Sequence, residues 1–360
     1  MPLDLRAPAD ELTAALCDIE SVSGGEREIA DEIERTLSTA GHLTLVRDGD
    51  AVVARTTLGR GRRVIVAGHL DTVPVNRNLP VRREVQDGSE WLVGRGTVDM
   101  KGGVAVQLKL AAELVAPRSD VTWIWYDHEE VDAAKNGLGR LALNHPEFLN
   151  ADFAILGEPS NGVVEGGCNG TLRVAVTARG VRAHSARSWA GVNAIHAAAP
   201  VLDALADYRP REVEVEGLRY REGVNAVGIS GGVAGNVIPD ECTVLVNYRF
   251  APSRTGEQAV RHLEELFAGF DVTVLDLAEG ARPGLDSVIA REFLDAVGVE
   301  AAPKYGWTDV ARFSALGVPA VNYGPGDPTL AHTDDERVPV AQLLDVEARL
   351  RRWLSGGPRR

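Results

Sequence analysis

The stretch RVIVAGHLDTVP, residues 63–74, indicates the fold of this chain. Four apolar, mostly β-branched residues follow its first arginine, a pattern typical of a strand buried on both faces of a parallel sheet. The turn after this strand carries His69 and Asp71. Two similar runs, at 121–126 and 154–156, are separated from it by a segment with helical spacing. Strands that alternate with helices in this way predict an α/β sheet with helices on both faces.

The pattern of hydrophobic residues changes near residue 167. TLRVAVTA (171–178) and TVLVNYRF (243–250) alternate polar and apolar residues, which predicts strands with one exposed face. Helical patterns at 192–205 and 257–267 accompany these strands. We therefore expect a catalytic α/β domain at 1–166 and 281–360, with a mixed sheet between helices. A smaller α+β domain is expected as an insertion at 167–280.

The composition excludes several classes of protein. With 38 basic and 52 acidic residues the formal net charge is −14, which repels phosphate backbones and anionic lipids, so we expect neither nucleic acid nor a membrane as a partner. Cys17, Cys168 and Cys242 are scattered and form no CxxC pair, which fits a reducing compartment and excludes a disulfide framework or a thiolate zinc site. The first residues contain no apolar signal segment. These observations predict a cytoplasmic enzyme.

Further side chains that bind metals follow the predicted strands. Glu129 and Glu130 come after the second strand and Glu158 after the third, while Asp99 lies in the glycine-rich loop GRGTVDMKGG just before a helix. His332 lies in GPGDPTLAHTDDERV, a loop that follows another predicted strand. Because ligand sites in α/β sheets collect beyond the carboxyl ends of strands, we expect these side chains to lie on the same edge of the sheet.

Each of these residues also has a simpler interpretation. His69 and Asp71 fit a turn, the glutamate pair fits a solvated surface, Asp99 fits a helix cap, and His332 fits a surface loop. Their joint occurrence favours a metal site, and histidine with carboxylate suits catalytic zinc, or else cobalt or manganese. Asp71, two residues past His69 on an extended chain, is expected to accept the second imidazole N–H. One glutamate of the pair is a ligand, which leaves the other to take a proton from water.

The chain resembles the aminoacylase, carboxypeptidase and desuccinylase family of co-catalytic zinc amidohydrolases. The resemblance rests on GHLDTVP, GRGTVDMKGG, the glutamate pair, LGEPS, RAHS, NVIPDE and PTLAH, which occur in family order along nearly the whole chain. It implies a zinc-peptidase-like catalytic domain and an inserted lid that forms a homodimer. It also implies two Zn²⁺ per subunit, bridged by Asp99. His69 and Glu158 would complete one metal site, and Glu130 and His332 the other.

The same resemblance assigns roles to three further residues. Glu129 would be the general base, and Asp71 the partner of His69. His184, in the motif RAHS, would cross the dimer interface and donate to the oxyanion in the partner's active site. From the residues alone, His184 also fits a turn between a strand and a helix.

Longer stretches, among them EEVDAAKNGLGRL and YGWTDVARFSALGVPAVNYGPGDPTLAH, are most similar to the succinyl-diaminopimelate desuccinylases. This implies a small N-acyl amino-acid substrate, N-succinyl-LL-2,6-diaminopimelate, cleaved to succinate and LL-2,6-diaminopimelate in lysine biosynthesis. Arg249 is the expected ligand of a substrate carboxylate, although it also fits the solvent-facing side of its strand. Asn236 is expected to donate an amide hydrogen bond, and Thr171 and Thr308 match substrate-contacting positions of desuccinylases.

Two alternatives remain at this stage. The chain could be another N-acyl amino-acid deacylase or exopeptidase of the same fold, such as an acetylornithine deacetylase. It could also be a scaffold that binds a metal or a peptide without catalysis. Glu129 beside five candidate ligands argues against the second alternative, because a binding protein needs no additional base.

Overall fold

The computed structural model describes residues 3–356, and their contacts form two compact units. The first unit comprises Met1–Gly166, Pro283–Ala302 and Arg312–Arg360, and the second comprises Gly167–Arg282 and Pro303–Ala311. The first unit is α/β, with a mixed sheet between helices, which confirms the predicted fold class of the catalytic part. The role of the inserted part as a lid and dimer interface stays a prediction.

The second unit includes one segment that the sequence analysis assigned to the catalytic domain. Pro303–Ala311 returns to the second unit, where the carbonyl of Lys304 accepts a hydrogen bond from the backbone N–H of Asn169 at 3.2 Å. The carbonyl of Thr308 lies 3.8 Å from the thiol of Cys168. These contacts join residues distant in sequence, so the hydrophobic pattern of the segment gave no sign of them.

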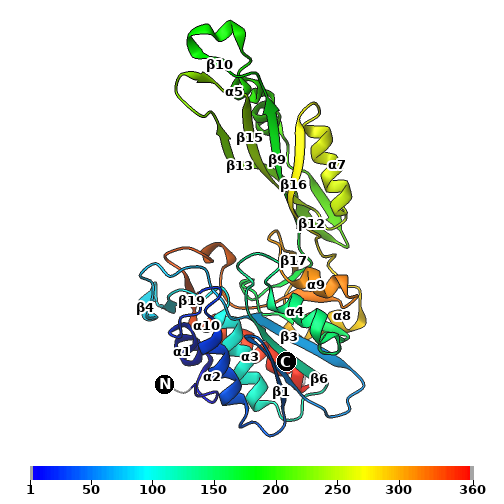
Figure 1. Cartoon of the computed structure of the whole chain (residues 1–360). Helices are drawn as coiled ribbons and strands as arrows, with labels where there is room; N and C mark the ends of the chain where they lie inside the picture. The colour runs from blue at the N-terminus through cyan, green and yellow to red at the C-terminus, as the bar shows by residue number, and fades with distance from the viewer. Residues whose placement is uncertain (1–2, 357–360) are drawn as a thin grey trace. The chain divides into compact units, whose positions relative to one another are not determined.

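The sheet of the first unit has eight strands in the order β1-β2-β6-β3-β7-β18-β8-β17. The four central strands β6, β3, β7 and β18 are parallel, while β1, β2 and β8 pair antiparallel at either side. The neighbouring strands β3 and β6 and helix α3 are labelled in Figure 1. The bounds of the strands of this sheet are β1 Thr44–Asp48, β2 Ala51–Arg55, β3 Arg63–His69, β6 Asp120–Tyr126, β7 Phe153–Leu156, β8 Val164–Gly166, β17 Ala301–Pro303 and β18 Ala320–Asn322. The carboxyl ends of the four parallel strands therefore meet at one edge.

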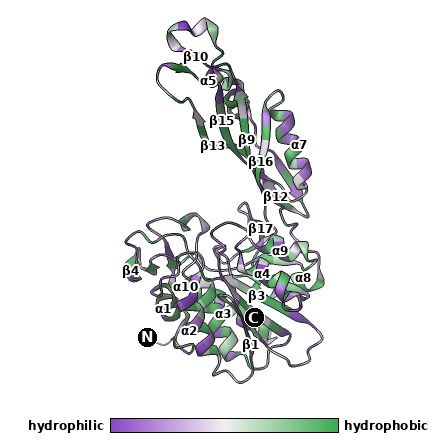
Figure 2. Cartoon of the chain, viewed as in Figure 1, coloured by the Kyte–Doolittle hydropathy of each residue, from purple (hydrophilic) through white to green (hydrophobic). Residues whose placement is uncertain are grey.

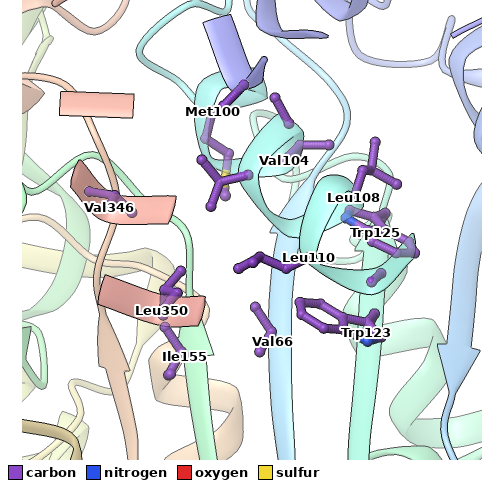
Figure 3. Packing of buried hydrophobic residues seen from close by; sticks show 14 of the residues in the cluster. Val66, Met100, Val104, Leu108, Leu110, Trp123, Trp125, Ile155, Val346 and Leu350 are labelled. Carbon is purple, nitrogen blue, oxygen red and sulfur yellow. The ribbon is translucent and has the colours of Figure 1, made fainter. Parts of the chain in front are cut away.

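The central strands are apolar because both faces of the sheet are covered. Trp123 and Trp125 point to one face of β6 and join a core with Val66 of β3, Leu108 of α3 and Leu350 of α10 (Figure 3). The intervening residues of β6 point to the other face and are also fully buried. The helices of this unit are α1 Ala9–Cys17, α2 Arg27–Leu37, α3 Lys101–Glu113, α4 Gly137–Asn144, α8 Val288–Val297 and α10 Val340–Ser355, with α9 Val310–Ala315 beginning in the segment before Arg312.

The glycine-rich segment 94–103 runs into α3 and lets the start of that helix pack closely against the end of β7. A Cβ on Gly103 would clash with the carbonyl oxygen of Gly157, just beyond β7, so only glycine lets the start of α3 approach this strand end. A three-stranded sheet, β4 Arg82–Gln86, β5 Ser89–Val93 and β19 Arg337–Pro339, leads into this loop. The loop and the carboxyl ends of the central strands thus lie together.

The second unit is an antiparallel sheet covered by helices. Its order is β13-β15-β9-β16, and the inward residues of β9 and β15, such as Val174 and Val246, form a core with Leu263 of α7. Figure 2 shows hydrophobic residues along β9 and β15 and hydrophilic residues on α7. The bounds are β9 Gly170–Arg179, β10 Ala183–His184, α5 Ala194–Ala197, α6 Ala199–Asp207, β11 Glu212–Val215, β12 Leu218–Arg221, β13 Gly223–Gly231, β14 Val237–Ile238, β15 Glu241–Phe250, α7 Gly256–Leu266 and β16 Asp271–Ala278.

One helix expected at 192–205 is interrupted in the structure. It forms α5 and α6, which meet at Ala198. Pro200 lies in the first turn of α6 and has no N–H to continue the hydrogen bonds of α5, so the second helix starts anew there. Among residues 3–356, no helix combines the length and the apolar character that crossing a bilayer requires.

Candidate metal centre and active site

The candidate ligands lie at the carboxyl ends of neighbouring strands. His69 is the last residue of β3, Glu130 follows β6, and Glu158 follows β7. Because these strands are parallel neighbours in the order β6-β3-β7, their ends deliver the three side chains to one place. His332 comes from the loop after β18, the next strand of the same sheet.

Asp99 connects two groups of side chains. Its Oδ1 lies 2.9 Å from Nε2 of His69, and its Oδ2 lies 3.3 Å from Nε2 of His332. Nε2 of His332 also lies 2.9 Å from Oε1 of Glu130, and Oε1 of Glu158 lies 3.8 Å from Nε2 of His69. Asp99 does not cap α3, since the cap residue is Met100 and no side chain caps that terminus.

The five side chains form two groups that share Asp99. One group is His69, Asp99 and Glu158, and the other is Asp99, Glu130 and His332; the ligand atoms within each group lie within 4.8 Å of one another. Each group offers one imidazole nitrogen and two carboxylate oxygens. This donor set suits a catalytic zinc that keeps an open position, and it also accommodates cobalt or manganese.

The carboxylates make this site strongly favourable for positive charge. Hydrogen bonds to Asp99 and Glu130 raise the pKa of His332 to about 10. Burial alone would lower the pKa of His69, but its bonds to Asp71 and Asp99 raise that pKa well above the usual range. Burial, together with the nearby Asp99, raises the pKa of Glu130. A pair of divalent cations would satisfy the same carboxylates.

Asp71 faces Nδ1 of His69 with both its carbonyl and its carboxylate, and it also holds the glutamate pair. The closest acceptor for Nδ1 of His69 is the backbone carbonyl of Asp71 at 3.0 Å, and the carboxylate Oδ1 lies at 3.5 Å. The carboxylate accepts hydrogen bonds from the backbone N–H groups of Glu129 and Glu130 and from the hydroxyl of Ser23, at 2.9, 3.0 and 2.7 Å. Although burial opposes its ionisation, these bonds and His69 lower the pKa of Asp71 to about 2.

The glutamate pair projects from a tight turn. His128 adopts a left-handed conformation with φ of 59°, and its backbone N–H donates to the buried Glu26 at 3.2 Å. The preceding Asp127 accepts hydrogen bonds from Arg140 at 2.6 and 3.0 Å. In this turn a carboxylate oxygen of Glu129 lies within 4.8 Å of a ligand atom of His69, from one group, and of Glu130, from the other. Glu129 itself is a member of neither group that contains Asp99.

Sequence reasoning missed Glu336, which fixes the loop that carries Asp99. Its side chain is fully buried, and Oε1 accepts hydrogen bonds from the backbone N–H groups of Val98 and Asp99 at 3.0 and 3.1 Å. Its Oε2 accepts a hydrogen bond from Nη1 of the buried Arg95 at 2.7 Å. The only sequence signal was its position shortly after His332, within a run of acidic residues.

The remaining predicted residues lie in the second unit. His184 and Asn236 are exposed neighbours, since the N–H of Ser185 donates to the carbonyl of Asn236 at 2.9 Å. Thr171 and Arg249 are paired across β9 and β15. The hydroxyl of Thr171 accepts a hydrogen bond from the amide of Asn247, which in turn accepts one from Arg249 Nε, both at 3.2 Å. The predicted residue Thr308 is buried in the returning segment of this unit.

The chain matches a known peptidase family and is similar to named relatives over nearly its whole length. Residues 65–355 match peptidase family M20/M25/M40. A Mycobacterium tuberculosis protein named as a succinyl-diaminopimelate desuccinylase is 55% identical over 98% of this chain and 100% of its own length. The succinyl-diaminopimelate desuccinylase of Corynebacterium glutamicum is 48% identical over 98% of both chains. A Bacillus subtilis structure, described as a dinuclear metal-binding peptidase of the M20 family, shares the fold with a TM-score of 0.71 at 16% identity, over 96% of each chain.

Proposed function

The chain belongs to peptidase family M20/M25/M40, and we propose that it hydrolyses N-succinyl-LL-2,6-diaminopimelate to succinate and LL-2,6-diaminopimelate. The reaction class is supported by the two ligand groups that share Asp99 and by the carboxylate of Glu129, which lies within 4.8 Å of ligand atoms of His69 and Glu130. The substrate is supported by the names of relatives that are 48–55% identical to this chain over nearly its whole length.

We propose Zn²⁺ at both ligand groups, with Co²⁺ or Mn²⁺ as possible replacements. His69, Asp99 and Glu158 would hold one cation, and Asp99, Glu130 and His332 the other. Two divalent cations so placed would activate a water and polarise the scissile carbonyl. The comparison that supports a pair is the Bacillus subtilis relative, which is described as dinuclear.

Glu129 is proposed as the general base. Its carboxylate lies beside both ligand groups, so it is within reach of a water held there. It would accept the proton of that water and deliver it to the leaving amine. Proton transfer by such a group typically contributes about 10²- to 10⁴-fold to the rate. Asp71 holds the backbone of Glu129 and so orients the base.

The second unit is proposed to form a homodimer and to contribute His184 to the partner's site. The edge strand β13 exposes Val227 and Ile229, which are 60% and 55% accessible, and the segment after His184 exposes Trp189 at 82%. Exposed apolar side chains along an unpaired strand edge are typical of surfaces that pair with another chain. His184 is itself exposed on this unit, as an intersubunit donor must be.

Arg249 is proposed to bind a carboxylate of the substrate, with Thr171, Asn236 and Thr308 as further contacts. The Arg249 side chain is exposed, and within residues 3–356 its one hydrogen bond runs from Nε to Asn247, so its remaining N–H groups are available for a bidentate bond. The three cysteines of the chain are buried and unpaired, which supports the proposal of a cytoplasmic enzyme.

Steady-state kinetics would test this function directly. The zinc-loaded protein should cleave N-succinyl-LL-2,6-diaminopimelate with a far higher kcat/KM than N-acetylornithine. Chelation should abolish the activity and added zinc should restore it. A preference for N-acetylornithine would make the chain a different deacylase of the same family. No hydrolysis of either compound by a protein with full metal content would support the non-catalytic alternative.

A further inference from the structure

The second unit contains a cavity that none of the proposed catalytic residues lines. Its volume is about 410 Å³, and its lining includes Val213 of β11 and several residues of α7. The lining includes Arg211, Arg254, Arg261 and His262. Sites for small molecules typically measure about 300–1,000 Å³, so this cavity has room for a ligand of a few heavy atoms with its water. A concentration of guanidinium groups is notable in a chain of net charge −14.

The positive charges of the cavity are only loosely neutralised. Nε of Arg254 lies 3.5 Å from Glu222, and Nη1 of Arg261 lies 3.7 Å from Glu257. Both distances exceed the roughly 2.7–2.9 Å of a charge-assisted hydrogen bond. No acidic side chain among residues 3–356 pairs with Arg211. These guanidinium groups therefore keep hydrogen-bonding capacity for another anion.

Buried polar atoms beside the cavity also lack partners. In the part of the chain that the structure describes, Nε2 of His262 and the hydroxyl of Tyr208, which can donate to an anion, have no hydrogen-bond partner. Oε2 of Glu222, which is 2% exposed, also has none, but as an acceptor it would need an ordered water rather than an anion. The rings of Tyr208 and His262 lie 6.4 Å apart, so these atoms belong to one region. Buried polar groups in folded proteins are nearly always bonded, and several unbonded ones together indicate a missing ligand or ordered water.

We propose that this cavity binds a small anion that carries a carboxylate or phosphate group. Arg211 and Arg261 would bind the anion through the planar fork of their guanidinium groups, which matches both kinds of oxyanion. His262 would donate a hydrogen bond from Nε2 when its imidazole carries the hydrogen on that nitrogen. Arg254, whose Nε lies 3.5 Å from Glu222, would offset the negative charge of that carboxylate. Glu265, also in the lining, limits the site to small anions of low charge.

Histidine NMR on the full-length, zinc-loaded protein gives a readout specific to this cavity. The chain has eight histidines, and the signal of His262 can be assigned from its loss in His262→Gln. Inorganic phosphate and succinate are titrated separately at constant ionic strength. Either anion could also bind at the zinc centre, but that event would shift the signals of His69 and His332 instead. We expect a saturable shift of the His262 signal.

A control variant distinguishes specific binding of the anion in the cavity from nonspecific electrostatic attraction to the protein. The double variant Arg211→Gln/Arg261→Gln should weaken the midpoint of the His262 shift by about tenfold or more, because two charge-assisted bonds are lost. Arg219→Gln removes a guanidinium from the neighbouring strand β12 that does not line the cavity, and should leave the midpoint nearly unchanged. All three arginines are exposed, so folding should tolerate these replacements.

The two titrations also identify the chemistry of the ligand. Saturation by phosphate alone would identify a phosphate-bearing ligand, and saturation by succinate alone a carboxylate-bearing one. The proposal is overturned if neither anion shifts the His262 signal, or if chloride at the same ionic strength reproduces the shift. It is also overturned if the double variant retains the midpoint of the unmodified protein.

Discussion

Oδ1 of Asp71 accepts a hydrogen bond from the backbone N–H of Glu129 at 2.9 Å. Oδ2 of the same carboxylate accepts one from the N–H of Glu130 at 3.0 Å, and the Asp71 carbonyl is bonded to the imidazole of His69. One residue thus holds the backbone of the proposed base, one candidate ligand of each group, and the turn that follows β6. The two ligand groups and the base are therefore coupled through Asp71.

Asp71→Asn should weaken metal binding and slow turnover together. The amide replaces one acceptor by a donor, which then faces an N–H of Glu129 or Glu130 without a bond. Loss of a partner that orients metal ligands typically costs about 10- to 100-fold in metal affinity or activity. Zinc content by elemental analysis and kcat of the zinc-saturated protein measure the two effects. Ser23→Ala, which removes only one bond to the same carboxylate, should have a smaller effect. Unchanged zinc affinity and kcat in Asp71→Asn would show that this coupling is unimportant.

Glu129→Gln should retain near-normal zinc content but lose most of kcat. The amide preserves the shape of the side chain and cannot accept a proton, so turnover should fall by about 10²-fold or more. Glu130→Gln is the matched control, because it alters the neighbouring carboxylate and should lower zinc occupancy at the group with His332. If Glu129→Gln kept more than about a tenth of the original kcat, another group would have to be the base.

Glu336→Gln should destabilise the metal-free protein. The substitution leaves the charge of Arg95 buried without its carboxylate, and breaking a buried ion pair typically costs about 3–5 kcal/mol. Glu90 on β5 forms an exposed ion pair with Arg83 on β4, so Glu90→Gln should cost at most about 1 kcal/mol. Urea denaturation of the chelated proteins gives both values. Equal effects of the two substitutions would mean that Glu336 has no special part in holding the loop of Asp99.

The positions of most candidate ligands followed from the order of strands in the sequence. His69, Glu130 and Glu158 each come just after an apolar run, and parallel strands bring such positions to one edge. His332 likewise follows a predicted strand, and Asp99 precedes a helix in a glycine-rich loop, so both were expected at the same edge. The family resemblance added how the five would divide between two metals. The structure brings all five together.

Other features left no local signal in the sequence. Glu336 stands in the acidic run DDE, where a solvated surface is the ordinary interpretation, and its burial depends on Arg95, 241 residues away. Strand β13 was missed because its sequence GVNAVGISG contains three glycines and most of its residues are exposed. The return of Pro303–Ala311 to the second unit likewise depends on contacts with distant residues such as Asn169.

Arg249→Ala should raise KM for a succinylated substrate, because a bidentate bond to a carboxylate is lost. Arg249→Lys should restore binding only in part, since a point charge does not replace the planar fork. Arg173→Ala on β9 is a suitable control, because it removes another exposed arginine of the same unit, 3.8 Å from Asp276. Unchanged kinetics in both Arg249 variants would assign this residue to the solvent-facing side of its strand.

The last prediction concerns the homodimer and His184. If His184 acts on the partner's site, His184→Ala should bind zinc normally and turn over about 10²- to 10³-fold more slowly, the usual cost of losing one oxyanion donor. Mixing this variant with Glu129→Gln should then restore activity from two nearly inactive preparations. In a heterodimer one active site has both defects, while the other combines an intact Glu129 with the intact His184 of its partner. Gel filtration must first show a dimer, and tagged subunits must be shown to exchange. Confirmed heterodimers as inactive as their parents would mean that His184 does not act across the interface.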